Sequence, residues 1–139
     1  MAATKGTRML RLTLLAVGVI FLAGLYPLTI LWPSGWAWHH GGSSMYLQMI
    51  IGLYATLGIF LILASRQPLA HRSLIWFVVW SSVVHADIMA VQSFAYPEHR
   101  AHLYGDVPAL FIIAGVLAAA VLSSNRKTQS PDSLGPARS

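Results

Sequence analysis

The chain has 139 residues, of which 56% are hydrophobic and 9% charged, with no cysteine and a net charge of +5. A soluble domain carries about 25% charged residues, so this composition and the mean hydropathy of +0.63 exclude a water-soluble enzyme. The missing cysteine also excludes disulfides, zinc–thiolate sites and iron–sulfur clusters. The positive charge does not indicate nucleic-acid binding, because the basic residues lie in short groups between apolar runs, as in the loops of membrane proteins.

Four apolar stretches are long enough to cross a bilayer, which takes about 20 residues. We expect these spans at residues 12–32, 45–64, 73–94 and 107–122. Each must be helical, because lipid offers no partner to an unpaired backbone amide, and the short connections make neighbouring spans antiparallel. The sequence therefore predicts an all-α, four-helix up-and-down bundle as one transmembrane domain, residues 1–122. A disordered polar tail is expected at residues 123–139.

The positions of lysine and arginine predict the orientation of the spans. Of the nine such residues, all but Arg100 lie before the first span, between the second and third, or after the fourth. Basic loop residues concentrate on the cytoplasmic side of a membrane, so we expect both termini in the cytoplasm. The basic start also resembles a signal peptide, but its apolar run is too long and no good cleavage site precedes Pro33. The first span is therefore expected to remain.

Small residues, a proline and three tryptophans predict how the spans pack. Small residues let helices approach closely; they are Gly18, Gly24, Gly52, Gly58, Ala114, Gly115, Ala118 and Ala119. Pro27 is expected to kink the first span, because its ring leaves the carbonyl of Ala23 without a partner. Trp32, Trp36 and Trp38 follow this span and are expected at the membrane interface.

The third span carries polar groups that are costly in a membrane, about 2.5–3.5 kcal/mol for a charged group at the bilayer centre. His85 lies near mid-depth, and Ser81, Ser82 and Gln92 share its face of the helix. We take His85, Gln92 and Ser82 as candidate cofactor-binding residues, with a quinone, a metal or a proton relay as open possibilities. A haem is disfavoured, because no other span carries a histidine at the depth of His85. The alternative is a neutral imidazole bonded to a serine or carbonyl. Asp87 points elsewhere and is expected to be buried and neutral, or held by a polar partner.

A second polar set follows the third span. Glu98 and His102 are spaced i, i+4, and His102 and Asp106 repeat that spacing. Together with His99 they form a candidate metal site, because imidazole and carboxylate suit a divalent first-row metal. The alternative interpretation has Asp106 capping the fourth span, with Pro108 in its first turn.

Two segments carry a family resemblance, His71–Gln92 and His102–Leu110, and Leu28–Trp36 fits the same family's first loop. Over residues 9–122 the chain resembles a bacterial family of small four-span membrane proteins of unknown function, DUF6632. The resemblance implies a multi-pass protein of a bacterial inner membrane. It implies no activity, substrate or cofactor.

Three hypotheses about function follow. The first is a non-enzymatic accessory, assembly or oligomeric membrane subunit, because no catalytic motif is visible and no cofactor is required. Its partners would be the lipid bilayer and a second copy or another membrane protein. The alternative is a membrane redox or metal- or quinone-binding protein that uses His85, Gln92, His102 and Asp106. The third is a proton-linked transporter with Asp87 and His85 as carriers.

Overall fold

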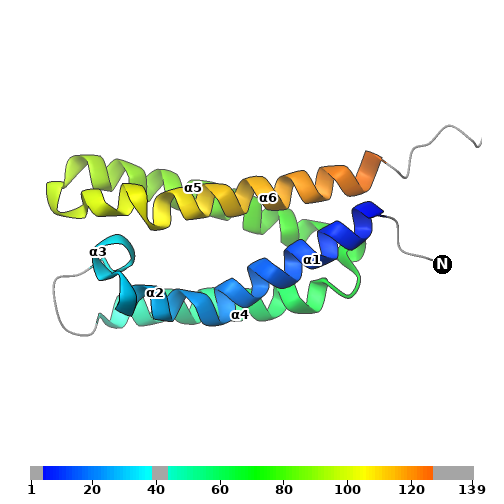
Figure 1. The fold of residues 1–139 in the computed structure, drawn as a ribbon, viewed down its shortest axis with the longest axis horizontal. Coiled ribbons are helices and arrows are strands. Elements are labelled where there is room, and N and C mark those ends of the chain that lie inside the picture. The colour runs from blue at the N-terminus through cyan, green and yellow to red at the C-terminus, as the bar shows by residue number, and fades with distance from the viewer. Residues whose placement is uncertain (1–4, 39–43, 127–139) are drawn as a thin grey trace, which may run out of the picture.

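The computed structural model describes residues 5–38 and 44–126, and every regular element in these ranges is a helix (Figure 1). The first rod joins α1 (Lys5–Val19), a π-helical turn η1 (Ile20–Gly24) and α2 (Leu25–Leu31). A short helix α3 (Pro33–Trp36) follows, and then α4 (Met45–Ala64). The second half of the chain contains η2 (Pro68–His71), α5 (Arg72–Ala95), η3 (Pro97–Tyr104) and α6 (Asp106–Arg126).

Four helical segments within the described residues are long and apolar enough to cross a membrane. Figure 1 shows that the described ends of the chain, in α1 and α6, lie at the same end of the molecule. We call this the terminal end, and we call the opposite end, which carries α3 and η3, the loop end. The predicted all-α bundle of four membrane-length helices is therefore confirmed.

Two helix boundaries differ from the sequence prediction. The first helix begins at Lys5 rather than at residue 12, because its basic residues are exposed and continue the same helix. α6 runs to Arg126, past residue 122, and the hydroxyls of Ser123 and Ser124 donate to carbonyls of the preceding turn. The start of the predicted tail is therefore helical, while residues 127–139 lie outside the described residues.

The helices pack in the spatial order α4–α1–α6–α5. α1 packs against both α4 and α6, and α5 packs against α6, whereas α4 and α5 are not a packed pair although they follow each other in the chain. The largest fully buried apolar side chains come from α1, η1, α4, α5 and α6; they are Leu10, Leu14, Phe21, Leu61, Ile75 and Leu117. The core thus forms along α1 and leaves α4 and α5 as the two free edges of the arrangement.

Glycine allows the close approach of the first rod to α4. A Cβ atom on Gly58 would lie 2.6 Å from the carbonyl oxygen of Gly18, and one on Gly18 would lie 2.9 Å from that of Gly58. The prediction of close packing is confirmed for these two residues. It is wrong for Gly52 and Gly115, which face open space, because the packed face of α6 carries the buried Ala114 instead.

The expected irregularity before Pro27 takes the form of a π-helical turn. It covers Ile20–Gly24 and so includes Ala23, the residue whose carbonyl the proline leaves without a partner. Large apolar side chains point outward on several helices, as Leu31 of α2, Met45 of α4 and Phe94 of α5 show. Such a surface indicates contact with lipid rather than water.

Candidate functional site

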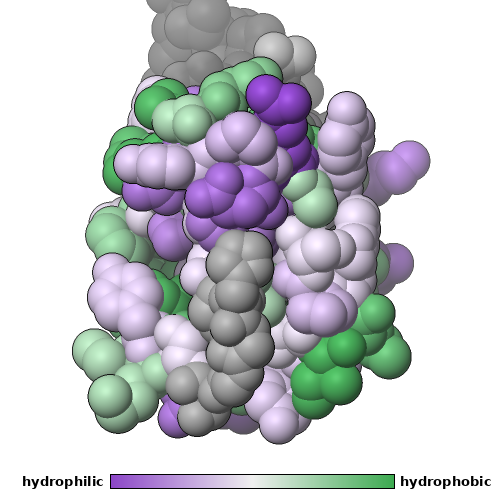
Figure 2. Space-filling model, turned by 90° about the vertical axis from the view of Figure 1, so that its left-hand side faces the viewer, coloured by the Kyte–Doolittle hydropathy of each residue, from purple (hydrophilic) through white to green (hydrophobic). Residues whose placement is uncertain are grey.

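The loop end is assembled where α3 meets η3. Both begin with a proline, Pro33 and Pro97, whose fixed φ angle suits the first turn of a helix. Gly105 then lies directly against the backbone of Gly35, where a Cβ atom would overlap a carbonyl oxygen. Figure 2 views this end and shows hydrophilic residues gathered near the middle, with hydrophobic residues toward the edge. The two glycines thus allow α3 to lie directly against the end of η3.

Three side chains form a buried polar cluster at this contact, which we call the Trp38–His102–Asp106 cluster. The indole Nε1–H of Trp38 donates to Oδ2 of Asp106 at 2.9 Å, and His102 Nδ1 lies 2.9 Å from the same oxygen. A carboxylate can only accept, so His102 carries its hydrogen on Nδ1. The rings of Trp38 and His102 stack with centroids 4.0 Å apart, and His102 is only 1% exposed.

The cluster changes the interpretation of Asp106. Asp106 is the first residue of α6, where a negative charge is favourable at the positive end of the helix dipole. Its Oδ2 is bonded to side chains, and its Oδ1 is buried without a hydrogen-bond partner among the described residues. The predicted capping role is therefore not the one that the structure gives it: the carboxylate joins three segments instead.

The four candidate metal ligands lie at the same end but do not converge. His99 stacks on Trp38 with ring centroids 4.8 Å apart, whereas Glu98 is exposed. Within residues 5–38 and 44–126, no group of three or more His, Asp or Glu side chains has an arrangement that could hold a metal ion. The metal site at Glu98, His99, His102 and Asp106 stays a prediction.

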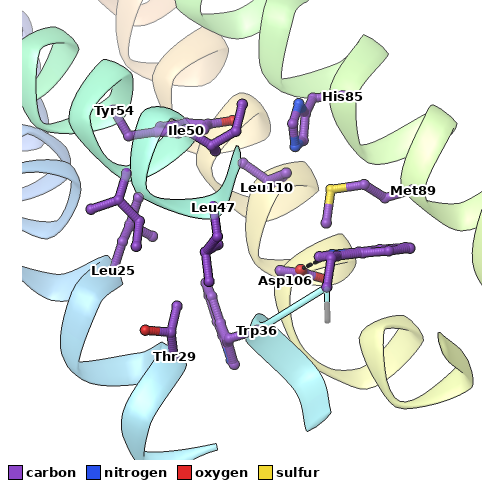
Figure 3. Close-up of a pocket in the computed structure, with 12 residues that line it drawn as sticks. Leu25, Thr29, Trp36, Leu47, Ile50, Tyr54, His85, Met89, Asp106 and Leu110 are labelled. Atoms are coloured by element: carbon purple, nitrogen blue, oxygen red, sulfur yellow. Dashed lines mark hydrogen bonds between the residues drawn. The ribbon is translucent and has the colours of Figure 1, made fainter. Parts of the chain in front are cut away.

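A cavity of about 80 Å³ lies beside the Trp38–His102–Asp106 cluster. Figure 3 shows side chains of α2 and α4 on one side of it, including Leu25 and Ile50, and side chains of α5 and α6 on the other, including His85 and Asp106. Trp36 also lines the cavity, and its Nε1 is buried without a partner among the described residues.

Two larger hollows continue from this cavity between α4 and α5, and we call them together the α4/α5 groove. Their volumes are about 380 and 340 Å³, and both share Ile50 and His85 with the cavity. The ring of His85 meets that of Tyr54 edge to face, with centroids 6.0 Å apart. In the described part of the chain, no hydrogen bond involves its imidazole, so the alternative of a histidine bonded to a serine or carbonyl is not what the structure shows.

The structure separates the other polar residues of the third span. Gln92 lines one hollow of the groove with His85, and Ser81 lines the other. Ser82 is buried and lines neither the groove nor the cavity. Asp87 is exposed on the outer surface of the bundle rather than buried between its helices, and it does not share a hollow with His85.

Three aromatic residues of the site, Trp36, Trp38 and Tyr54, were not identified from the sequence. Trp36 and Trp38 carry the interface pattern, and the indole of Trp38 bonds to a carboxylate 68 positions away in the chain. Tyr54 sits in an unbroken apolar run of α4. A useful signal would have been the pairing of two tryptophan N–H donors with the few carboxylates of the chain, since a buried indole N–H normally finds an acceptor.

Comparison with known proteins identifies the family and nothing more specific. Among curated proteins and solved structures, none matches the chain. The family of unknown function DUF6632 matches residues 4–136. The chain, with its four membrane-length helices, therefore belongs to the family DUF6632.

Proposed function

We propose that this protein binds a lipid-soluble molecule from the bilayer in the α4/α5 groove. The observation that carries the proposal is the separation of α4 from α5, which leaves His85 and Ile50 lining three adjoining hollows. This is the quinone-type form of the ligand-binding hypothesis, and it requires no metal.

The walls of the groove favour a ligand that arrives from the lipid. Several lining side chains are themselves exposed on the outside of the bundle, including Leu53 at 64%, Phe77 at 61% and Ile88 at 53%. Because these residues lie on membrane-length helices, the rim of the groove lies at the level of the acyl chains. An apolar tail can enter there without passing through water.

The interior of the groove favours a ligand with a polar group. Its lining combines apolar side chains with a smaller number that carry hydrogen-bonding groups, which are His85, Ser81, Gln92, Trp38, Ser44, Tyr46, Tyr54 and Thr56. Ligand sites commonly combine such an apolar surface with a few polar groups that fix orientation. A quinone or a similar amphipathic molecule has this chemistry. We propose that the protein binds this ligand without transforming it, in keeping with a non-enzymatic accessory subunit.

Native mass spectrometry of protein extracted from its own membrane in mild detergent tests this function. We expect a retained small molecule on the wild type, and at least a tenfold lower occupancy in Ile50→Trp, whose indole fills the groove. Ile59→Trp is the matched control, because Ile59 is on the same helix, is 46% exposed and lines none of the hollows. Equal occupancy in the two variants, or none in the wild type, contradicts the proposal.

A second candidate function, as a homo-oligomeric subunit, is favoured by the position of Asp87. It is exposed on α5 between the exposed Val84 and Val91, on a face that otherwise suits lipid. An acidic side chain facing hydrocarbon is costly, and packing of this face of α5 against a second copy across a two-fold axis would remove it from the lipid.

The oligomer is tested by the mass of the protein in mild detergent, measured by light scattering. We expect a dimer for the wild type and for Asp87→Asn, which keeps hydrogen-bonding groups, and a monomer for Asp87→Leu. A monomeric wild type contradicts this candidate.

We also propose that the protein lies in a bacterial inner membrane with both termini in the cytoplasm, as one transmembrane domain with a polar tail. The support is the bias of basic residues: Lys5, Arg66 and Arg72 are at the terminal end, whereas Arg100 is in η3 at the loop end. A fluorescent reporter that folds only in the cytoplasm, fused after Ser139, is expected to fluoresce. A periplasm-specific reporter active at the same position contradicts the orientation.

A further inference from the structure

Two buried polar atoms beside the groove are complementary, and neither has a hydrogen-bond partner among the described residues. Oδ1 of Asp106 is a hydrogen-bond acceptor, and Nε1–H of Trp36 is a donor. Asp106 is 6% exposed, and both residues line the 80 Å³ cavity. Native proteins leave few buried polar atoms unpaired, so such a pair beside one cavity calls for an explanation.

Within residues 5–38 and 44–126, hydrogen bonds engage only one of the two carboxylate oxygens of Asp106. Trp38 and His102 both engage Oδ2, and their stacked rings fix the direction in which the carboxylate points. This leaves Oδ1 as a preorganised acceptor at the N-terminus of α6. The rest of the cavity wall is largely apolar, with Leu25, Leu47 and Leu110 among the lining residues.

We infer that this cavity is the head-group subsite of the groove and takes a hydroxyl group, as in a long-chain or isoprenoid alcohol or a phenol. A hydroxyl donates to Oδ1 of Asp106 and accepts from Nε1 of Trp36. An ammonium group can satisfy only the carboxylate, and a carbonyl group can satisfy only the indole.

The place of the cavity in the fold agrees with this orientation. Because Ile50 and His85 line both the cavity and the groove, a hydroxyl in the cavity leaves the rest of the molecule directed along the groove toward lipid. Asp106, the first residue of α6, and Trp36, the last residue of α3, both belong to the loop end of the bundle. This inference rests on the proposed function and specifies its ligand class.

The test compares two probes, farnesol and farnesyl methyl ether, bound to the full chain in nanodiscs and counted by native mass spectrometry. The ether keeps the tail and an oxygen acceptor but cannot donate to Asp106. We expect farnesol to bind about ten- to a hundredfold more tightly, the range that a hydrogen bond to a charged group gives. Equal affinities overturn the hydroxyl subsite, because water alone would then satisfy the two groups.

Variants separate the subsite from the groove. Asp106→Asn is expected to reduce the preference for farnesol toward unity. Trp36→Phe is expected to weaken both probes alike, because both accept from the indole. Thr29→Val is the control, since Thr29 lines the cavity but its hydroxyl already donates to the carbonyl of Tyr26. An unchanged preference in a folded Asp106→Asn protein overturns the subsite.

The two proposals fail in different ways. If both probes bind equally and Ile50→Trp abolishes both, the groove holds a ligand but the hydroxyl subsite is wrong. If neither probe binds and the protein from its own membrane carries no small molecule, the groove itself is wrong. Should Asp106→Asn fail to fold, Trp36→Phe still decides: binding unaffected by the loss of its N–H contradicts the inference.

Discussion

The terminal half and the loop half of the bundle are built differently from the same four helices. In the terminal half, one continuous cluster of buried side chains joins all the long helices, with Leu14, Leu61, Ile75 and Leu117 among its members. In the loop half, the buried apolar cluster is smaller and contains Met89 and Leu110, with Trp38 packed against it. The 80 Å³ cavity and the polar cluster occupy the remaining space there, while the larger hollow of the α4/α5 groove extends to Phe60 and Leu74 in the terminal half.

This difference suggests a division of labour within the molecule. Apolar burial gives little net drive to helix association in lipid, so close packing stabilises the terminal half. The loop half relies on a few directional contacts around Asp106, which hold their segments without filling the space between α4 and α5. The polar end of a binding site therefore belongs in the loop half, and stability depends most on the terminal half.

The same substitution placed in each half gives the largest expected contrast. Leu61→Trp inserts an indole into a site that is 0% exposed, and it should lower the free energy of unfolding by about 3 kcal/mol. In Ile50→Trp the indole enters the hollows between α4 and α5, and the free energy of unfolding should change by less than about 1 kcal/mol. Thermal unfolding in detergent measures both, and equal losses would contradict the division into a packed and an open half.

The polar cluster should make a smaller contribution. Trp38→Phe keeps an aromatic ring beside His102 but removes the donor to Asp106, and it should cost about 2 kcal/mol. Trp32→Phe is the control, because Trp32 is 42% exposed. Denaturation in a mixed-micelle titration compares the two. If they prove equally stable, the hydrogen bond does not hold the loop end together.

The glycine contact tests the terminal half more finely. Gly58→Ala should destabilise by about 1 kcal/mol, because the overlap with Gly18 and Leu22 outweighs the better helix propensity of alanine. A Cβ atom on Gly52 would meet no atom within 4 Å, so Gly52→Ala should leave the free energy of unfolding unchanged or raise it. The melting temperatures of the two variants test this. A lower melting temperature for Gly52→Ala than for Gly58→Ala would contradict the close approach of α1 to α4.

The smallest effect is expected on the outer face of α5. Asp87→Asn should change the stability of a single chain by less than about 0.5 kcal/mol, because Asp87 is exposed and lines none of the hollows. Unfolding should be measured at a dilution that keeps the protein monomeric. A loss above about 1 kcal/mol would show that Asp87 acts within its own chain.

The fold was readable from the sequence because the spans are set by local properties. Runs of apolar residues fix the four long helices, and Gly18 and Gly58 mark a real contact. Helix ends were less accurate: Ser123 and Ser124 look like tail residues, but their hydroxyls bond to helix carbonyls. A serine hydroxyl can bond to the backbone both inside a helix and in a turn or tail, so composition alone does not place the end of α6.

The site was only partly readable because it depends on which helices are neighbours. His85 and Gln92 share a face by helical periodicity, and the i, i+4 spacing brings His102 to Asp106. The same periodicity allowed either Ser81 or Ser82 to face the groove, and packing on α6 rather than α4 decided for Ser81. Trp38 meets Asp106 only after α3 has folded back onto η3, and no local pattern encodes that contact.

Binding of a ligand in the α4/α5 groove is tested most directly by photolabelling in nanodiscs with a diazirine analogue of farnesol, followed by peptide mapping. We predict labels on the less exposed residues that line the α4/α5 groove, such as Ile50, Tyr54 and Met89, and their loss when excess farnesol competes. Labels confined to outward-facing residues such as Leu63 and Phe111, unaffected by competitor, would contradict a ligand held between α4 and α5.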